Sequence, residues 1–461
     1  MNGNAWNFCI LAAGQGKRMK SNLPKVMLPA LGRPLLQYLL DIPRINGYQQ
    51  TVVVVSPDNH DVVASTASGA EIVVQENQRG TADALKSALP TLLSFGEYVV
   101  VVYGDMPLIK EETLQRLTSY FVQERVEMCF LSTRAPFLAA YGRVVRDGKG
   151  EVLKVVEERD CSPREREITE MNIGVYAFRT SILKEILDAL DNNNAQDEFY
   201  LTDAVEACRA CGYVVTALEI PWSDEFLGVN TPGDYSRVMD ELRKRKATQL
   251  FEQGVKILDP STTYVDWETR VAEDVWLYPG TIIEGKSSIG RGSRIGPYTR
   301  LYESQVGERC KVEFSVVEGA ILENEVMVGP YSHLRPGTHL MQGVRVGNFV
   351  ETKQAKLGEG TKALHLAYLG DAMLGKNVNI GAGAITCNYD GTRKHQTTIG
   401  DGAFIGTNNS LVAPVRIGEG AYTAAGSTIT RDVPPESLGV SRCRQENKEE
   451  WAKKRARGDK K

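Results

Sequence analysis

Glycine, arginine and lysine residues near the start of the chain are spaced as in a phosphate-binding segment. Residues Leu11 to Met19 read LAAGQGKRM, and Lys25 follows shortly after them. Glycine and other small residues let the backbone approach a ligand closely, which leaves amide N–H groups free for phosphate oxygens. Arg18 and Lys25 add the fixed positive charge that stabilises a phosphoryl-transfer transition state. Taken alone the motif is weak, because a turn with a solvated arginine has the same sequence.

Polar residues beside glycines recur further along the first half. They are Gln75, Gly80-Thr81, Tyr103-Gly104-Asp105, Tyr141-Gly142-Arg143, Glu157, Asn172-Ile173-Gly174 and Gly228-Val229-Asn230. Asp105 comes just after the apolar run that ends at Val102. An acidic residue at the carboxyl end of a strand can hold a Mg²⁺ ion that bridges phosphates. A single aspartate in a turn is also commonly structural.

Polar loops in the second half carry a different chemistry. The segments 334–337, 347–353, 365–371, 377–383 and 385–391 contain histidine, arginine, lysine, asparagine and tyrosine. His365 is our candidate general base, because imidazole titrates near neutral pH and an amine must lose a proton before it is acylated. Arg335 and Lys353 have the charge to hold a phosphate. The alternative for His365 is a structural histidine bonded to a main-chain carbonyl.

A six-residue period organises the second half. Aliphatic residues recur at Ile283, Ile289, Ile295 and Leu301, again from Leu322 to Val346, and again from Ile399 to Ile417, and glycine follows many of them. This hexapeptide period is typical of a parallel β-helix, in which the aliphatic side chains stack inward. We therefore expect a β-helix over residues 254–461.

The first half has the alternating pattern of an α/β domain. Apolar runs of strand length cover Phe8–Ala12, Thr51–Val55, Tyr98–Val102 and Met128–Ser132, with room for helices between them. This predicts a mainly parallel, doubly wound, Rossmann-like sheet over residues 1–232, with ligands at the carboxyl ends of its strands. A charged, partly amphipathic stretch over 233–253 predicts a connecting helix.

Composition excludes several classes of protein. The chain has 461 residues, 42% hydrophobic and 24% charged, with a net charge of -4, so it lacks the overall positive field of a nucleic-acid-binding protein. It has neither a membrane-spanning stretch nor a leader-like start, and we expect a cytoplasmic protein. Its eight cysteines are irregularly spaced and predict free thiols, with Cys208 and Cys211 expected to be buried.

The first half resembles the sugar-1-phosphate nucleotidyltransferases, through the LAAGQGKRM segment and the later Pro24-Lys25 pair. The resemblance implies catalytic roles for Arg18 and Lys25 and an Mg²⁺ ion held by Asp105 and Asn230. It also implies contacts to the nucleotide and the sugar from Leu11, Ala12, Ala13, Gly14, Lys25, Gln75, Gly80, Thr81, Tyr103, Gly104, Asp105, Gly142, Glu157, Asn172 and Asn230. One departure is visible: Gly80-Thr81 is followed by Ala82-Asp83, where the uridyltransferase branch usually has Gly-His.

With its second half included, the chain resembles bacterial bifunctional N-acetylglucosamine-1-phosphate uridyltransferase/glucosamine-1-phosphate N-acetyltransferases. This resemblance implies a left-handed β-helix, assembly as a homotrimer with shared sites, and His365 as the general base. The implied amino-sugar-phosphate site is Arg335, Lys353, Tyr368 and Asn379. The implied acetyl-CoA contacts are Ala382, Asn388, Tyr389, Thr407, Ala425 and Arg442, with Thr407 where the family more often has serine.

The family pattern implies two reactions. Glucosamine-1-phosphate is acetylated from acetyl-CoA in the second half, and N-acetylglucosamine-1-phosphate is uridylated from UTP in the first half, without a nucleic-acid or membrane partner. Two alternatives belong to other classes. One is a single-activity nucleotidyltransferase with a regulatory β-helix, and the other is a non-catalytic scaffold. His365 and the loop at Asn388-Tyr389 argue against both, since a purely architectural coil needs neither.

Overall fold

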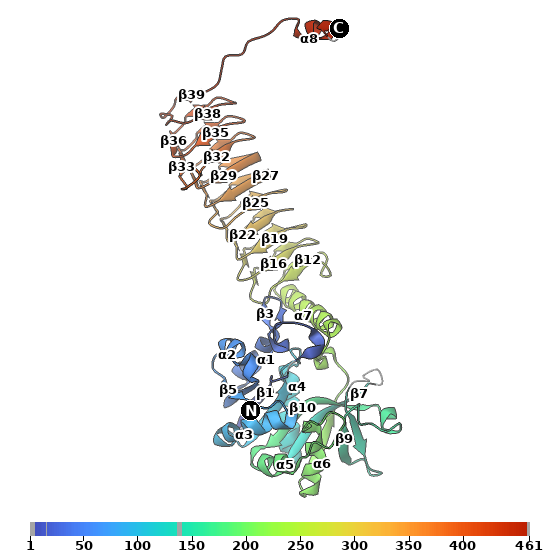
Figure 1. Ribbon diagram of the computed structural model, residues 1–461. Coiled ribbons are helices and arrows are strands. Elements are labelled where there is room, and N and C mark those ends of the chain that lie inside the picture. Colours follow the sequence, from blue (N-terminus) through green and yellow to red (C-terminus); the bar gives the residue numbers. More distant parts are fainter. Residues whose placement is uncertain (1–4, 15, 136–140, 459–461) are drawn as a thin grey trace. The chain divides into compact units, whose positions relative to one another are not determined.

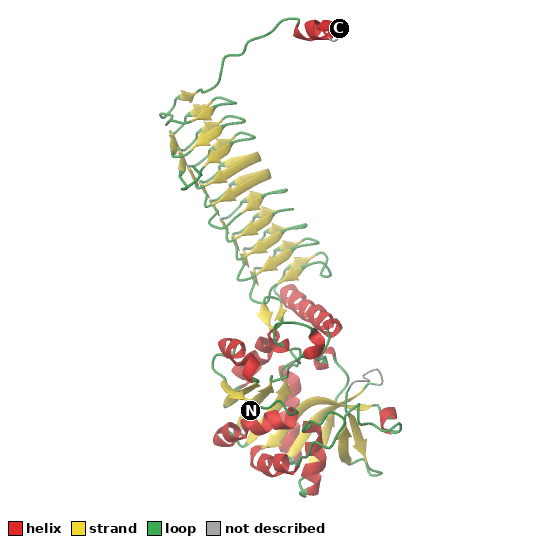
Figure 2. Ribbon diagram, in the orientation of Figure 1, coloured by secondary structure: helices red, strands yellow, loops and turns green. Residues whose placement is uncertain are grey.

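A computed structural model describes residues 5–14, 16–135 and 141–458, and in it the chain forms two compact units, Met1–Leu242 and Arg243–Lys461. Figures 1 and 2 show an α/β unit followed by a β-helix. The helix α7 (Pro232–Glu252) contains the point at which the two units meet in sequence. None of the described helices has the length and apolar character needed to cross a bilayer.

The first unit is built on one twisted sheet in the order β11-β7-β10-β6-β1-β4-β5. All neighbours along it are parallel except β10, which runs antiparallel to β6 and β7. The strands are β1 (Trp6–Leu11), β4 (Gln50–Val55), β5 (Glu71–Val74), β6 (Tyr98–Tyr103), β7 (Met128–Arg134), β10 (Glu170–Arg179) and β11 (Val215–Glu219), with β8 (Arg143–Arg146) and β9 (Val152–Val156) beside β10. The predicted, mainly parallel sheet is confirmed.

Helices cover both faces of this sheet, because successive residues of a strand point to opposite sides. Phe8 and Ile10 of β1 pack with the helices α1, α2 and α4, whereas Cys9 and Leu11 pack with α3, α5 and α6. The helices are α1 (Leu35–Asn46), α2 (His60–Thr66), α3 (Thr81–Phe95), α4 (Glu111–Glu124), α5 (Leu183–Ala189) and α6 (Ala204–Ala210). The arrangement is the doubly wound fold predicted from the sequence.

The second unit is a left-handed parallel β-helix whose short strands run from β12 (Lys256–Ile257) to β39 (Leu438–Gly439). Ile283 pairs in register with Leu301, Leu301 with Val317, and Val317 with Leu334, so each turn of the chain lies on the previous one. The aliphatic residues of the six-residue period form one continuous buried core. This confirms the hexapeptide prediction, and a terminal helix, α8 (Trp451–Gly458), follows.

Two strands of the β-helix are much longer than the rest. β27 (Arg345–Lys353) and β29 (Lys362–Gly370) each have nine residues, whereas most of the others have two or three. They pair along their length, with Asn348 opposite His365 and Lys353 opposite Gly370. The polar loops predicted from the sequence therefore extend these strands at one corner of the helix.

The cysteine prediction needs one correction. All eight cysteines are free, as expected, and Cys208 is buried. Cys211, however, is exposed. The reason is that α6 ends at Ala210, so Cys211 lies on the following turn instead of on the buried face of the helix.

Candidate functional site

The first unit contains a cavity of about 980 Å³ at the carboxyl ends of β1, β5 and β6. The predicted residues that line it are Leu11, Ala12, Ala13, Gly14, Arg18, Lys25, Gln75, Gly80, Thr81, Tyr103, Asp105 and Asn230. The structure thus brings together residues that lie up to 219 positions apart in the sequence.

Lys25 is the centre of the polar group in this cavity. Its Nζ lies 2.5 Å from Oδ2 of Asp105 and donates to Oδ1 of Asn230 at 3.2 Å. The side chains of Lys25 and Asp105 are each only 14% exposed. Two hard oxygen donors therefore converge on one positive charge, an arrangement suited to binding a cation or balancing phosphate charge.

Local structure fixes both oxygen donors. Asp105 lies two residues after the end of β6, and its carbonyl oxygen accepts a hydrogen bond from the N–H of Val229 at 2.9 Å. Asn230 stands just before the capping box of α7, in which Asp234 accepts from the N–H of Thr231 at 2.8 Å and its own N–H donates to Oγ1 of Thr231 at 3.2 Å. The same carboxylate accepts from the N–H of Asn230 at 3.2 Å. The start of α7 therefore sets the position of Asn230.

The residues expected to contact the sugar form a neighbouring cluster. The N–H of Asn172 donates to the carbonyl oxygen of Gly142 at 2.8 Å, and Nδ2 of Asn172 donates to the Tyr176 hydroxyl at 2.7 Å. That hydroxyl lies 3.4 Å from the hydroxyl of Tyr103, which lines the cavity. Burial raises the pKa of Glu157, which accepts from Thr202 at 3.0 Å. Asn172, and Gly142 bonded to it, thus connect to the cavity through Tyr176 and Tyr103, and Glu157 lies beside Gly142. The three are not among the lining residues of the cavity.

Glycine is required at two positions of this site. Gly174 has φ +86°, and an added Cβ would lie 2.5 Å from the ring of Tyr103. Gly80 has φ +118°, and an added Cβ would lie 2.4 Å from the carbonyl oxygen of Phe199. Gly104, by contrast, does not line the cavity. Its N–H donates to the carbonyl oxygen of the lining residue Leu11 at 2.9 Å.

Several lining residues had no signal in the sequence. Arg159, Gln196 and Glu198 lie on loops with no glycine motif beside them. Residues 196–199 reach the site because the N–H of Phe199 bonds to the carbonyl oxygen of Arg79 at 2.7 Å, a contact between segments far apart in sequence. A single sequence carries no pattern that predicts such a pairing.

In the second unit the candidate base lies on the extended strand β29. The chain has five histidines. Four of them lie against a carboxylate: His60 at 2.9 Å from Asp61, His333 at 3.2 Å from Glu318, His339 at 2.8 Å from Glu323 and His395 at 2.7 Å from Asp390. His365 is exposed and makes no such contact in the described part of the chain. Its imidazole is therefore accessible to a ligand.

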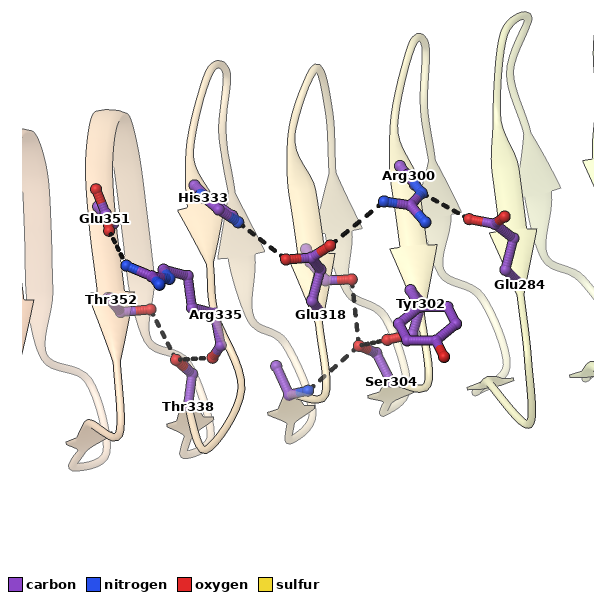
Figure 3. A network of polar contacts seen from close by, with 12 residues as sticks. Glu284, Arg300, Tyr302, Ser304, Glu318, His333, Arg335, Thr338, Glu351 and Thr352 are labelled. Atoms are coloured by element: carbon purple, nitrogen blue, oxygen red, sulfur yellow. Dashed lines mark hydrogen bonds and ion pairs between the residues drawn. The ribbon is translucent and has the colours of Figure 1, made fainter.

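Three cationic side chains lie together on the coils around β27. The ammonium group of Lys394 lowers the pKa of Lys353, and the guanidinium group of Arg335 lowers it further. NH1 of Arg335 donates to Oε1 of Glu351 at 3.0 Å, and a separate chain of polar contacts joins Glu284, Arg300, Glu318 and His333 on the preceding coils (Figure 3). Like charges held this close favour a bound anion. Lys394 was not among the predicted sugar-phosphate residues, because it follows a loop outside the hexapeptide period.

Tyr368 and Asn388 meet beside Gly370. An added Cβ at Gly370 would lie 2.5 Å from the hydroxyl of Tyr368 and 2.8 Å from Nδ2 of Asn388. Nδ2 of Asn388 also donates to Oδ2 of Asp371 at 2.5 Å. Asn379 lies on the next coil, in β31 (Asn379–Ile380), where it pairs in register with Lys362 of β29. The predicted amino-sugar residues thus occupy neighbouring coils.

The residues expected to contact acetyl-CoA lie mostly on the following coils of the β-helix. The N–H of Asn408 donates to the carbonyl oxygen of Ala382 at 2.7 Å, and that of Gly426 to the carbonyl oxygen of Thr407 at 2.8 Å, so the corners at 382, 407 and 425 lie on successive coils. Thr407 and Ala425 are exposed. Tyr389 is 61% exposed on a loop closed by its bridge to Lys394, and Arg442 is exposed after the last coil.

Comparisons with known proteins agree with this division of the chain. Residues 8–199 match the MobA-like NTP transferase domain, and residues 396–431 match the bacterial transferase hexapeptide model. The Bifunctional protein GlmU of Carboxydothermus hydrogenoformans is 45% identical over 96% of this chain and 99% of its own length. Those of Geobacillus thermodenitrificans and Thermosipho africanus are each 43% identical over 98% of both chains.

Such identity over almost the whole of each chain covers both units and both groups of site residues. The chain therefore belongs to the family of bifunctional GlmU proteins.

Proposed function

We propose that this protein is a bifunctional enzyme of UDP-N-acetylglucosamine synthesis. In its second unit it transfers an acetyl group from acetyl-CoA to glucosamine-1-phosphate, and in its first unit it transfers UMP from UTP to N-acetylglucosamine-1-phosphate, with release of pyrophosphate. The observation that supports the proposal is that one chain of this family carries two separate groups of polar residues, the Lys25–Asp105–Asn230 group in the first unit and the residues around the exposed His365 in the second.

For uridylation, the sugar-1-phosphate oxygen attacks the α-phosphorus of UTP in line, and the bond from that phosphorus to the pyrophosphate oxygen breaks. Positive charge from Lys25 and Arg18, both on the cavity wall, compensates the charge that develops on the phosphate oxygens. Glu157 and Asn172 supply the polar groups that orient the sugar. The site needs no covalent enzyme intermediate.

The donor set at Asp105 and Asn230 fits Mg²⁺. Both offer oxygen atoms, and both already face a cation, the ammonium group of Lys25. One or two protein oxygen atoms are the number of ligands by which Mg²⁺ is usually held at phosphate-binding sites, so Asp105 and Asn230 are the residues that would hold it here. When bound, Mg²⁺ would neutralise phosphate charge during the transfer.

For acetylation, His365 accepts a proton from the sugar amine as the nitrogen attacks the acetyl carbonyl carbon and the CoA thiolate leaves. Arg335, Lys353 and Lys394 hold the phosphate of the amino sugar, with Tyr368 and Asn379 beside them. Ala382, Asn388, Tyr389, Thr407, Ala425 and Arg442 bind acetyl-CoA along the coils. This assigns the sugar and the acetyl donor to adjacent parts of one surface.

We further propose that the second unit assembles as a homotrimer. An exposed aromatic ladder runs along one edge of the β-helix, with ring centroids 5.9 Å apart for Tyr298 and Phe314, and 5.6 Å apart both for Phe314 and Tyr331 and for Tyr331 and Phe349. Tyr298, Tyr331 and Phe349 are 70%, 56% and 59% exposed in the single chain. A continuous apolar stripe of this kind is typical of an interface. Sedimentation of the protein tests the assignment, and a monomer that acetylates at full rate would refute it.

The decisive experiment for the two activities mixes the protein with glucosamine-1-phosphate, acetyl-CoA, UTP and Mg²⁺ and follows both products. We expect His365→Ala to lose acetylation by about 10²- to 10⁴-fold while uridylation of supplied N-acetylglucosamine-1-phosphate is unchanged. Asp105→Ala should lose only uridylation. Loss of both reactions in either folded variant would contradict two independent sites.

A further inference from the structure

The amide of Gln75 is held in one orientation at the wall of the nucleotide cavity. Gln75 is only 3% exposed. Its Nε2 donates to the carbonyl oxygen of Gly80 at 3.1 Å and to Oδ2 of Asp83 at 2.9 Å. Both amide hydrogens are therefore used, since a carboxamide nitrogen carries two.

The opposite orientation of this amide is unfavourable. If the two ends of the amide were exchanged, Oε1 of Gln75 would face a carbonyl oxygen and a carboxylate, and both contacts would become repulsive. Of the two partners Asp83 is the stronger, because hydrogen bonds to an ionised group are about twice as strong as those between neutral groups. The hydrogen-bond network thus determines which end of the amide faces the cavity.

Asp83 is itself firmly placed. It lies in the first turn of α3, where an acidic side chain is favoured by the helix dipole, and its side chain is 11% exposed. Its other oxygen, Oδ1, accepts from NH2 of Arg79 at 2.9 Å. Both carboxylate oxygens are thus engaged, and the carboxylate is not free to turn away from Gln75.

What remains for a ligand is the acceptor Oε1. In the described part of the chain this oxygen accepts no hydrogen bond, and it is not fully buried. Gln75 also lines the cavity, as do Gly80 and Thr81. Arg79, a cation that lines the cavity too, is paired with Asp83 at 2.9 Å, so Arg18 and Lys25 are the cations that we assign to the triphosphate oxygens. We therefore assign the base to the side of the cavity at Gln75.

We propose that Asp83 is a positioning residue for base selection: it holds Gln75 with its carbonyl oxygen toward the base, so that the pocket favours uracil over cytosine. Uracil carries a hydrogen on its N3 ring nitrogen, which an acceptor can receive. Cytosine presents a bare ring nitrogen there, which an acceptor repels. The proposal rests on the proposed uridyltransferase activity and deepens it, and it gives a role to the Asp83 that stands where the family usually has histidine.

The test compares kcat/KM for UTP and for CTP, each with N-acetylglucosamine-1-phosphate. In Asp83→Ala the amide of Gln75 keeps only the neutral bond to Gly80 and can turn, so we expect the UTP-to-CTP ratio to fall by about tenfold. Asp83→Asn keeps an oxygen acceptor for Nε2 and should hold the ratio within about twofold. The matched control is Lys86→Ala, on the same helix α3 as Asp83, which removes an ion pair with Asp188 of α5 at 2.6 Å and should leave the ratio unchanged.

A second measurement needs no variant. UTP methylated at N3 has lost the hydrogen that Oε1 would accept, so the wild-type enzyme should use it at least about tenfold less well than UTP. Acetylation and the thermal unfolding midpoint, measured on each variant, report on folding. If Asp83→Ala keeps the full UTP preference, or if N3-methyl-UTP serves as well as UTP, the inference is wrong. A wild-type protein that does not use UTP at all would instead overturn the proposed function.

Discussion

Lys25→Met offers the sharpest test of the first site, because it changes the charge of the site with little change in side-chain length. Lys25 is the positive charge between Asp105 and Asn230, at 2.5 and 3.2 Å. Its removal takes away fixed charge that compensates the transferring phosphate. Losing one preorganised donor of this kind typically costs about 10²- to 10³-fold in rate, so we expect kcat/KM for uridylation to fall by that factor while acetylation is unchanged.

The same substitution should also lower the free energy of unfolding, and the exposure of the ion pair sets the size of this loss. Breaking a fully buried ion pair by removing one partner costs about 3–5 kcal/mol, because the other charge is left uncompensated. The 14% exposure of both side chains allows some solvation, so we expect about 1–3 kcal/mol for the first unit. Urea unfolding of the variant measures this loss.

A double variant separates the two effects. Adding Asp105→Asn to Lys25→Met removes the stranded carboxylate, so stability should recover while uridylation stays lost. Lys154→Met is the matched control, since it breaks an ion pair with Glu165 at 3.1 Å that is 41% and 21% exposed and should cost less than about 1 kcal/mol. Our reasoning fails if Lys25→Met uridylates within fivefold of the wild-type rate.

Three further predictions concern stability. Gly80→Ala should lower the unfolding midpoint and cost about 1–3 kcal/mol, because the new Cβ would lie 2.4 Å from a carbonyl oxygen at a φ of +118°. Lys246→Met should destabilise the second unit by about 2–3 kcal/mol in urea, because the buried Nζ donates to two main-chain carbonyl oxygens at 2.9 and 3.1 Å. Burial, with Glu157 as the next cause, raises the pKa of Asp203 from 3.8 to about 6, so folding favours its protonated form and stability falls as pH rises from about 4 to 6. Asp203→Asn should therefore stabilise the first unit by about 1–2 kcal/mol at pH 7.5 and by almost nothing at pH 4, as urea unfolding at both pH values will show.

Much of the fold follows from local patterns in the sequence. The six-residue period places Ile283, Ile295 and Leu334 in the core because each coil repeats the geometry of the one before it, so the sequence and the structure share one periodicity. The antiparallel direction of β10 has no such local signal. A strand's direction in a sheet depends on its connections, and neither apolar content nor length reports it.

The candidate sites were predictable to the extent that glycine and charge mark them. Arg18, Lys25 and Asp105 lie beside glycine motifs at strand ends, which is where ligands of an open α/β sheet bind. Lys394 and Glu198 reach their sites through loops, and their places depend on contacts between distant segments. Asp83 and Gln75 are a third case, since both residues were noted in the sequence but the hydrogen bond between them was not predicted.

The two candidate sites also differ in how far a single chain encloses them. The α/β unit forms its cavity of about 980 Å³ from segments in many parts of one chain. The β-helix, by contrast, stacks its residues along a surface, so His365 and Phe349 lie exposed on a corner instead of in a cleft. Acyl transfer needs an enclosed site that excludes water and surrounds the substrate. We therefore expect that a second copy in the proposed homotrimer supplies the facing wall of the His365 corner and covers the exposed aromatic ladder of the same unit.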